Sequence, residues 1–187
     1  SGMKKEKQKR DIWFVINAFA VALIVLAVMH TIQPYLEPPD PLKPQIMDHA
    51  ARIRVVDVNA VPAMLKSTNG KPTLMVVYAA WCGYCRMKMP EIIGLMREGK
   101  LAHVNMLFLS RDKSPMELSK YLVHEGFYKD VGAIIVNSTV SEPLDETLAA
   151  LGSQYAGSIP FFELYNADGK AARRINHNAS ADEIVSQ

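Results

Sequence analysis

The feature that most constrains the fold of this chain is a long apolar run near its N-terminus, from Ile12 to Ile32. Only three of its 21 residues are clearly polar: Asn17, His30 and Thr31. A helix of this length spans roughly 30 Å, the thickness of the hydrocarbon core of a bilayer. A cleaved signal peptide would have a shorter apolar stretch and a small-residue cleavage site, and a buried globular helix would carry a polar stripe. We therefore expect an uncleaved transmembrane helix over residues 12–32.

The charges on either side of this run predict its orientation. No Lys or Arg follows the run before Lys43, whereas five precede it. These five are Lys4, Lys5, Lys7, Lys9 and Arg10. Because cytoplasmic flanks are enriched in basic residues, we expect residues 1–11 in the cytoplasm and the C-terminal part on the periplasmic or extracytoplasmic side of the inner membrane. Ser1 and Gly2, which precede Met3, are expected to be the remnant of a cleaved tag.

The segment after the run, residues 33–47, is rich in proline. Its prolines are Pro34, Pro38, Pro39, Pro41 and Pro44. Proline fixes the backbone angle φ and removes a hydrogen-bond donor, so this composition predicts an extended, semi-rigid stalk. A proline-rich ligand for a recognition domain is the alternative. The position directly after the apolar run favours the stalk.

From residue 48 to residue 187, strand and helix patterns alternate. Residues 73–80 form a nearly unbroken apolar run, typical of a central strand covered on both faces. Further strands are expected at 52–59, 104–110 and 132–137, with a closing hairpin at 161–165 and 171–175. Helices are expected at 61–67, 83–98, 115–125 and 144–151, and a short one from Ser180. This order predicts one α/β domain with three layers and a mixed central sheet.

The chain has two cysteines, Cys82 and Cys85, separated by two residues. A structural disulfide framework would use more cysteines at wider spacing, and a closed zinc site would need two further ligands. The pair instead follows a buried strand and begins a helix. The first turn of a helix has unpaired N–H groups and about half a positive charge, which favour a thiolate on Cys82 over a free thiol, whose pKa is about 8.5. Cys85, on the same helical face, can then resolve a mixed disulfide.

Two motifs give the chain a family resemblance. The stretch W-C-G-Y-C-R-M-K-M-P, residues 81–90, resembles the thioredoxin active site, including Trp81 before the first cysteine and Pro90 five residues after the second. Ser158-Ile159-Pro160, before the strand F-F-E-L-Y, resembles the cis-proline loop that packs against the dithiol and binds the partner backbone in that family. The resemblance covers about residues 50–187. It implies a thioredoxin-like fold with Cys82 and Cys85 as catalytic residues.

The resemblance also extends to a branch of that family. Between Cys85 and Pro160 lie 74 residues, more than a minimal thioredoxin needs, and the surplus would supply an inserted helix and strand at about 115–137. With the N-terminal anchor, this layout is similar to the membrane-tethered, exported TlpA/ResA-like branch. It implies a thiol-disulfide oxidoreductase that acts on exported proteins with cysteines, such as apocytochromes c, and receives electrons from an integral-membrane thiol carrier. It implies no cofactor beyond the redox-active pair and no metal.

The sequence departs from the thioredoxin pattern at two points. Thioredoxin has a buried acid six residues before the first cysteine, where this chain has Val76. Glu163 is one candidate for the missing proton acceptor, if strand alternation points it inward; a solvent-facing Glu163, with water as acceptor, is the other interpretation. The dipeptide Gly83-Tyr84, which the isomerase branch of the family shares, implies a less reducing couple than thioredoxin.

Other functions fit the composition less well. The net charge is +2 and the basic residues are not pooled in the folded part, so nothing favours nucleic acid binding. The five histidines are scattered, so we expect them to be structural or solvated. Copper carriers on this fold use a C-x-x-x-C spacing and a distal histidine, which leaves Cu(I) binding as an alternative, beside an oxidant or isomerase and an inert scaffold. Trp81 and Tyr84 are expected to frame a partner-docking surface, with core packing as the alternative for Trp81.

Overall fold

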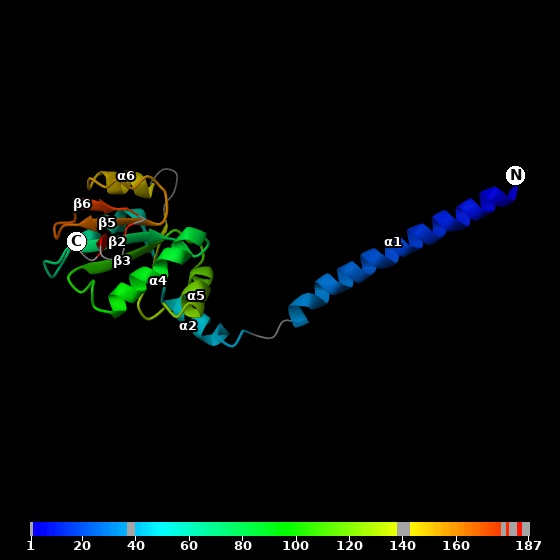
Figure 1. The fold of residues 1–187 in the computed structure, drawn as a ribbon, viewed down its shortest axis with the longest axis horizontal. Helices are drawn as coiled ribbons and strands as arrows, with labels where there is room; N and C mark the ends of the chain where they lie inside the picture. The colour runs from blue at the N-terminus through cyan, green and yellow to red at the C-terminus, as the bar shows by residue number, and fades with distance from the viewer. Residues whose placement is uncertain (1, 37–39, 138–142, 177–178, 180–182, 185–187) are drawn as a thin grey trace. The chain divides into compact units, whose positions relative to one another are not determined.

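The computed structural model describes residues 2–36, 40–137, 143–176, 179 and 183–184. The chain divides into two compact units, Ser1–Pro41 and Leu42–Gln187. The first contains a single described helix, and the second contains the whole sheet (Figure 1).

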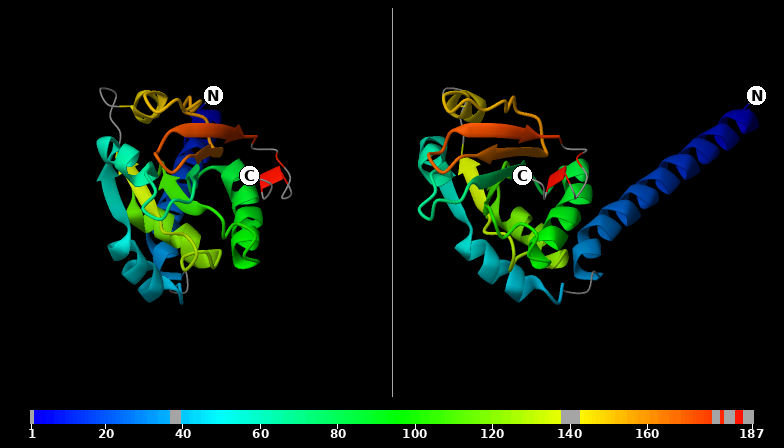
Figure 2. Two further views of the ribbon diagram at one scale, coloured as in Figure 1. Left: turned by 90° about the vertical axis from the view of Figure 1, so that its left-hand side faces the viewer. Right: turned by 60° about the vertical axis from the view of Figure 1, so that its left-hand side comes forward.

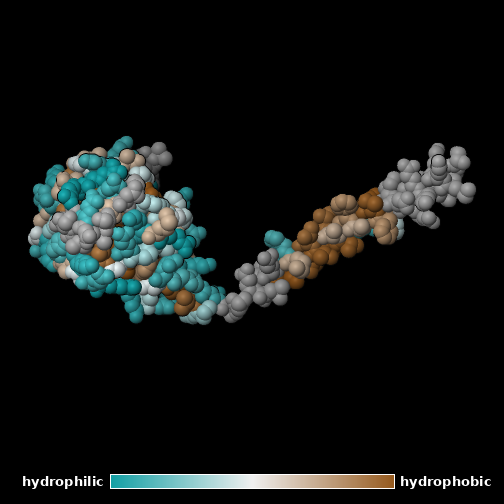
Figure 3. All heavy atoms as spheres, viewed as in Figure 1, coloured by the Kyte–Doolittle hydropathy of each residue, from teal (hydrophilic) through white to brown (hydrophobic). Residues whose placement is uncertain are grey.

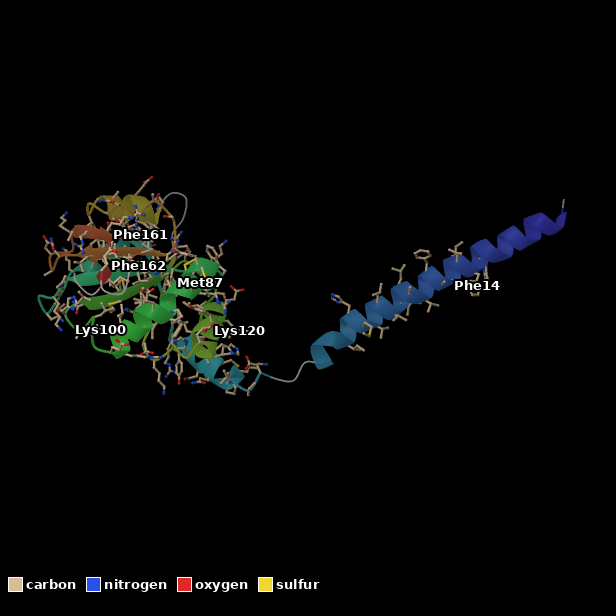
Figure 4. All side chains as sticks on the ribbon, in the orientation of Figure 1. Phe14, Met87, Lys100, Lys120, Phe161 and Phe162 are labelled. Atoms are coloured by element: carbon tan, nitrogen blue, oxygen red, sulfur yellow. A yellow bond between two sulfur atoms is a disulfide. The ribbon has the colours of Figure 1, made fainter. Side chains whose placement is uncertain are left out.

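The first unit is the helix α1, Gly2–Leu36. Its 35 residues correspond to a length of roughly 50 Å. Within it, Trp13–Ile32 is long and apolar enough to cross a membrane, with a mean hydropathy of 2.4, and none of that segment is buried against other parts of the protein. Figure 3 shows this apolar surface all around the visible side of the helix, and Figure 4 shows Phe14 projecting away from the helix axis.

The predicted extended stalk over residues 33–47 is wrong at both of its ends. Helix α1 continues through Pro34 to Leu36, and a second helix, α2, occupies Lys43–Arg52. Pro44 lies in the first turn of α2, where the missing N–H costs nothing and the fixed φ favours the helix. The compact unit accordingly begins at Leu42, so α2 belongs to the domain.

The domain is built on a six-stranded sheet in the order β1-β4-β3-β2-β5-β6. The strands are β1 (Arg54–Asp57), β2 (Thr73–Tyr78), β3 (Asn105–Ser110), β4 (Ile134–Asn137), β5 (Phe161–Tyr165) and β6 (Ala171–Ile175). The first four are parallel to one another, whereas β5 and β6 are antiparallel to their neighbours. The predicted mixed sheet is confirmed. The predicted extra strand is β4, which lies between β1 and β3.

Helices cover both faces of this sheet, which confirms the three layers. They are α2, a 3₁₀ turn at Val58–Ala60, α3 (Val61–Leu65), α4 (Gly83–Arg97), α5 (Pro115–His124) and α6 (Leu144–Ala149). Buried residues of α4 and α5 form one apolar cluster with the sheet, and those of α3 and α6 form another. Figures 1 and 2 show α6 on the opposite side of the sheet from α4 and α5. Helix α2 packs against α5.

Strand β2 separates the two clusters, because all six of its residues are buried. Leu74, Val76 and Tyr78 face α4 and α5, whereas Met75 and Val77 face α3 and α6. Successive side chains of a strand point to opposite faces, and a strand covered on both sides must therefore be apolar throughout. We call these the dithiol face and the opposite face.

Local signals set most of the other boundaries. Ser114 caps α5 by accepting a hydrogen bond from the N–H of Glu117, at 3.4 Å, as the predicted N-terminal signature requires. The hairpin strands end where the sequence predicted, and Gly169 in the turn adopts a φ of +82°, which glycine tolerates best. Of the short helix expected from Ser180, only Glu183 and Ile184 lie within the described residues, and both are helical.

Candidate redox site

The two cysteines lie at the start of α4, one short loop after β2. Cys82 is the N-cap residue, and its Sγ accepts a hydrogen bond of 3.2 Å from the N–H of Cys85. Cys82 and Cys85 form a disulfide with a Cα–Cα distance of 5.2 Å. Cys82 is partly exposed, whereas Cys85 is 1% exposed. Only Cys82 therefore offers a sulfur that an incoming thiol or disulfide can reach.

The electrostatic environment of Cys82 comes mainly from the helix itself. Helix α4 has 15 residues, and the partial positive charge of its N-terminus favours a thiolate on Cys82 once the disulfide is reduced. The nearby Arg86 is paired with Glu125 at 3.1 Å, and Lys88 with Glu91 at 2.9 Å. These two cations thus belong to the solvated helix face that the sequence predicted.

The structure brings the proline loop against the dithiol, although 74 residues separate them. The Ile159–Pro160 peptide bond is cis, and Sγ of Cys82 lies 3.9 Å from the carbonyl oxygen of Ile159. Pro160 is buried and immediately precedes β5, which pairs with β2. The resemblance of Ser158-Ile159-Pro160 to a cis-proline loop is therefore confirmed in geometry.

An apolar rim surrounds the exposed sulfur. Trp81 is 68% exposed, so the alternative that it packs in the core is wrong. Tyr84 and Met87 are also exposed on the first turns of α4, where Figure 4 shows Met87. Gly83 begins the helix, and the exposed Pro90 lies inside it, where it removes one backbone donor. Exposed aromatic side chains next to a reactive group are typical of a surface that binds partners.

Comparison with known proteins agrees with this arrangement. The crystal structure of a thiol:disulfide interchange protein of the thioredoxin family from Chlorobium tepidum matches the domain with a TM-score of 0.50 and 17% sequence identity, over 66% of this chain and 79% of that one. The domain has a thioredoxin-like fold. This confirms the fold that the two motifs of the thioredoxin-like domain implied.

Two curated relatives share parts of its sequence. A "Thiol:disulfide interchange protein TxlA homolog" from Synechocystis is 31% identical over 90 residues, 46% of this chain and 50% of the relative. A "Thioredoxin-like protein" from Haemophilus influenzae is 34% identical over 58 residues, 30% of this chain and 35% of the relative. The chain thus spans half or less of the length of these relatives. No family model matches the chain.

Glu163 is not the acid that replaces the one missing at Val76. It is 1% exposed, so the solvent-facing interpretation is wrong. It also lies opposite Met75 in the β2–β5 register, and Met75 belongs to the core between the sheet and helices α3 and α6. The Glu163 side chain therefore points to the opposite face, with the sheet between it and the dithiol.

The Glu163 carboxylate is instead a structural centre of the opposite face. It accepts hydrogen bonds from the Ser153 hydroxyl, from the Gln154 N–H at 3.0 Å and from the Tyr165 hydroxyl at 2.7 Å. Burial, together with the negative charge of Glu163, raises the pKa of Tyr165. Three donors satisfy the buried charge, as buried carboxylates require.

The acid on the dithiol face is Asp112, which sequence reasoning did not single out. It is 3% exposed, and its Oδ2 accepts hydrogen bonds from the Ala80 N–H at 2.9 Å and the Ser110 hydroxyl at 2.7 Å. Its position does leave a signal in the sequence. Asp112 follows the buried strand β3, and the carboxyl ends of parallel strands meet at one edge of the sheet, where β2 leads into the dithiol.

The described histidines do not assemble a site. His49 of α2 is buried with its Nδ1 3.0 Å from the Ser119 hydroxyl, and burial and the charge of Arg52 lower its pKa. His103 and His124 are exposed, and His177 lies outside the described residues. Within the part of the chain that the structure describes, no three His, Cys, Asp or Glu residues are placed to hold a metal ion.

Proposed function

We propose that this chain is a membrane-anchored thiol-disulfide oxidoreductase that exchanges disulfides with the cysteines of exported proteins. One observation carries the proposal. A cysteine pair at the N-terminus of a helix, with one sulfur exposed and one buried, faces a cis-proline loop. The names of the curated relatives and of the matching crystal structure support the same activity.

The reaction follows from the different exposure of the two sulfurs. With the pair reduced, the Cys82 thiolate attacks a client disulfide, forms a mixed disulfide and releases one client thiolate. The Cys85 sulfur then loses its proton and attacks Sγ of Cys82, and the second client sulfur leaves as a thiolate. The client gains two electrons and two protons, while Cys82 and Cys85 become the disulfide seen in the structure.

The apolar rim and the cis-proline loop would hold the client during this exchange. Trp81 and Tyr84 offer an apolar surface beside Cys82, and Ile159 places a backbone carbonyl within 3.9 Å of its sulfur. An extended client segment can pair with such an exposed backbone. We infer that specificity comes from the cysteine and its backbone, and less from charged side chains.

The location and the direction complete the proposal. Helix α1 would anchor the chain in the inner membrane, with residues 1–11 in the cytoplasm and the domain on the periplasmic side. The working direction would be reduction, with clients such as apocytochromes c and electrons supplied by an integral-membrane thiol carrier. Opposite roles on this fold differ in reduction potential, from about −270 mV for thioredoxin to about −120 mV for a strong oxidant.

The activity is tested by disulfide exchange of the full chain in detergent with insulin, with Cys82→Ser as the inactive control. We expect turnover by the native chain, none by the variant, and a potential nearer to −270 than to −120 mV, about the range of this fold. A potential at the upper end would make the protein an oxidant. No exchange combined with stoichiometric Cu(I) binding would replace the proposal with a copper carrier. A reporter fused after Gln187 tests the location, because it should be active only outside the cytoplasm.

A further inference from the structure

Three buried polar atoms on the dithiol face have no protein hydrogen-bond partner. They are Oη of Tyr78, Oδ1 of Asp112 and Oη of Tyr121, and no other described side chain has such an atom. Buried polar atoms in proteins are nearly always hydrogen-bonded, to protein or to ordered water. Three of them in one region mark a place suited to internal water and to proton transfer.

Asp112 is fixed to the segment that leads into the dithiol. Its Oδ2 accepts from Ala80, two residues before Cys82, while Oδ1 is left as a spare acceptor. Asp112 and Glu163 are the two buried carboxylates among the described residues, and only Asp112 lies on the dithiol face.

The two tyrosines link this acid to the buried cysteine. Tyr78 and Tyr121 belong to the same core cluster as Cys85. Burial and then the negative charge of Asp112 raise the pKa of Tyr78. Burial, with smaller contributions from Glu125 and Asp112, raises the pKa of Tyr121 to about 12. The charge of Asp112 is thus felt across the cluster that contains Cys85, where both phenols keep their protons at neutral pH.

A hollow of about 380 Å³ leads from Asp112 to solvent beside Trp81. It lies between the first turns of α4 and helix α5, where Figure 4 shows Lys120. The titratable and charged groups around Asp112 are Tyr78 of β2, Arg86 of α4, the neighbouring Arg111, and Glu117, Lys120, Tyr121, His124 and Glu125 of α5 and its end. Arg86 is held by Glu125 and lies 5.2 Å from the Tyr121 ring centre. The hollow therefore gives a proton on Asp112 a polar route out.

We propose that Asp112 is the acceptor of the proton that Cys85 loses when it resolves the mixed disulfide. The inference rests on the proposed function. Cys85 is 1% exposed, so its proton has no direct route to bulk solvent. The proton moves from Sγ of Cys85 through water beside Tyr78 to Asp112 Oδ1, as the Cys82–Cys85 bond forms and the bond from Cys82 to the client breaks. The electron pair leaves on the client thiolate.

Stopped-flow tryptophan fluorescence of the reduced full chain in detergent, mixed with bis(2-hydroxyethyl) disulfide, separates the two steps. Attack by Cys82 depends on the disulfide concentration, and resolution by Cys85 does not. For Asp112→Asn at pH 7 we expect resolution slower by about tenfold or more, the range for loss of one proton-transfer group, and attack within about twofold. The difference should close above about pH 9, where hydroxide accepts the proton.

Three further variants make the experiment specific. Asp112→Glu should restore most of the rate, and Tyr78→Phe should slow resolution alone, with the same pH dependence. Glu163→Gln, the matched buried carboxylate on the opposite face, should leave both steps as in the native chain. Tyr78→Phe keeps the aromatic ring, so it tests the proposal even if Asp112→Asn does not fold.

The outcomes separate this inference from the proposed function. If the native chain shows both steps and neither Asp112→Asn nor Tyr78→Phe alters resolution selectively, the inference is overturned and the function stands. If both steps slow in parallel at every pH, Asp112 only positions the loop, which also overturns it. If the native chain shows no attack by Cys82, the proposed function itself fails.

Discussion

The two faces of the sheet handle buried charge in opposite ways. On the opposite face, Glu163 is surrounded by three donors, from Ser153, Gln154 and Tyr165. On the dithiol face, Asp112 uses one oxygen and keeps the other without a protein partner, beside two tyrosine hydroxyls in the same condition. Both acids are almost completely buried, so the difference is one of bonding and not of exposure.

This difference teaches where to look for function in a fold of this kind. A fully bonded buried carboxylate stabilises the native state and holds its neighbours in place. A partly bonded one costs stability, and it is retained where it can exchange a proton. The face with the partly bonded acid is also the face with the exposed sulfur and the apolar rim. Four substitutions test this contrast.

The largest effect is expected on the dithiol face, from Cys85→Ser. Without the resolving sulfur, the mixed disulfide between Cys82 and the client persists, so turnover should fall by about a hundredfold or more while the fold is kept. The measurement is insulin reduction together with non-reducing electrophoresis of the covalent complex. A complex that forms equally in Cys82→Ser would show that Cys82 is not the attacking residue.

The opposite face should respond in stability and not in rate. Glu163→Gln removes the charge that three donors share, and we expect a loss of about 1–3 kcal/mol in the free energy of unfolding. Urea unfolding of the full chain in detergent measures it, with exchange of a small disulfide as the second measurement. A variant of native stability, or one that is stable but slow in exchange, would break the contrast between the faces.

A smaller effect is expected at the apolar rim. Trp81→Ala removes an exposed aromatic surface beside Cys82, so we expect exchange with a protein client to slow by about tenfold, corresponding to about 1.4 kcal/mol of contact. Exchange with a small disulfide should change by less than about twofold, because such a molecule does not span the rim. Equal losses for both substrates would mean that Trp81 supports the dithiol and does not bind the client.

The smallest effect is alkaline destabilisation through Tyr121. Its pKa is raised by burial to about 12, so the unfolded chain loses this proton near pH 10 while the folded domain keeps it. The unfolded state then binds fewer protons, and stability falls as the pH rises from about 10 to about 12. Tyr121→Phe should reduce that fall by about 1 kcal/mol in urea unfolding at pH 8 and pH 11. An unchanged fall would place its origin in other buried tyrosines, such as Tyr165.

The elements that sequence reasoning located were those with strong local signals. The apolar run of β2, the capped start of α5 and the Gly169 turn each determine structure through neighbours in the chain, and the structure has them where they were expected. Helix α2 was missed because Pro44 was taken to break a helix that it in fact begins.

The two acids were not predictable in the same way. Which face Glu163 points to depends on its register with Met75 of β2, and the burial of Asp112 depends on the parallel pairing of β2 with β3. Both pairings are long-range, and a shift of one residue would exchange the faces. The cysteine pair was found from sequence because its spacing and its place at a helix start are local.

Helix α2 also determines how the domain can be pulled. A load that enters at Leu42 meets a helix whose buried side lies on α5, where the Ser119 hydroxyl donates to the Ile46 carbonyl at 2.7 Å and lies 3.0 Å from His49. Traction along the chain would therefore be taken first by the seam between two helices, before it reached the edge strand β1. Helix α5 also walls the hollow beside Trp81. The point of mechanical attachment and the wall of the redox site are thus the same helix.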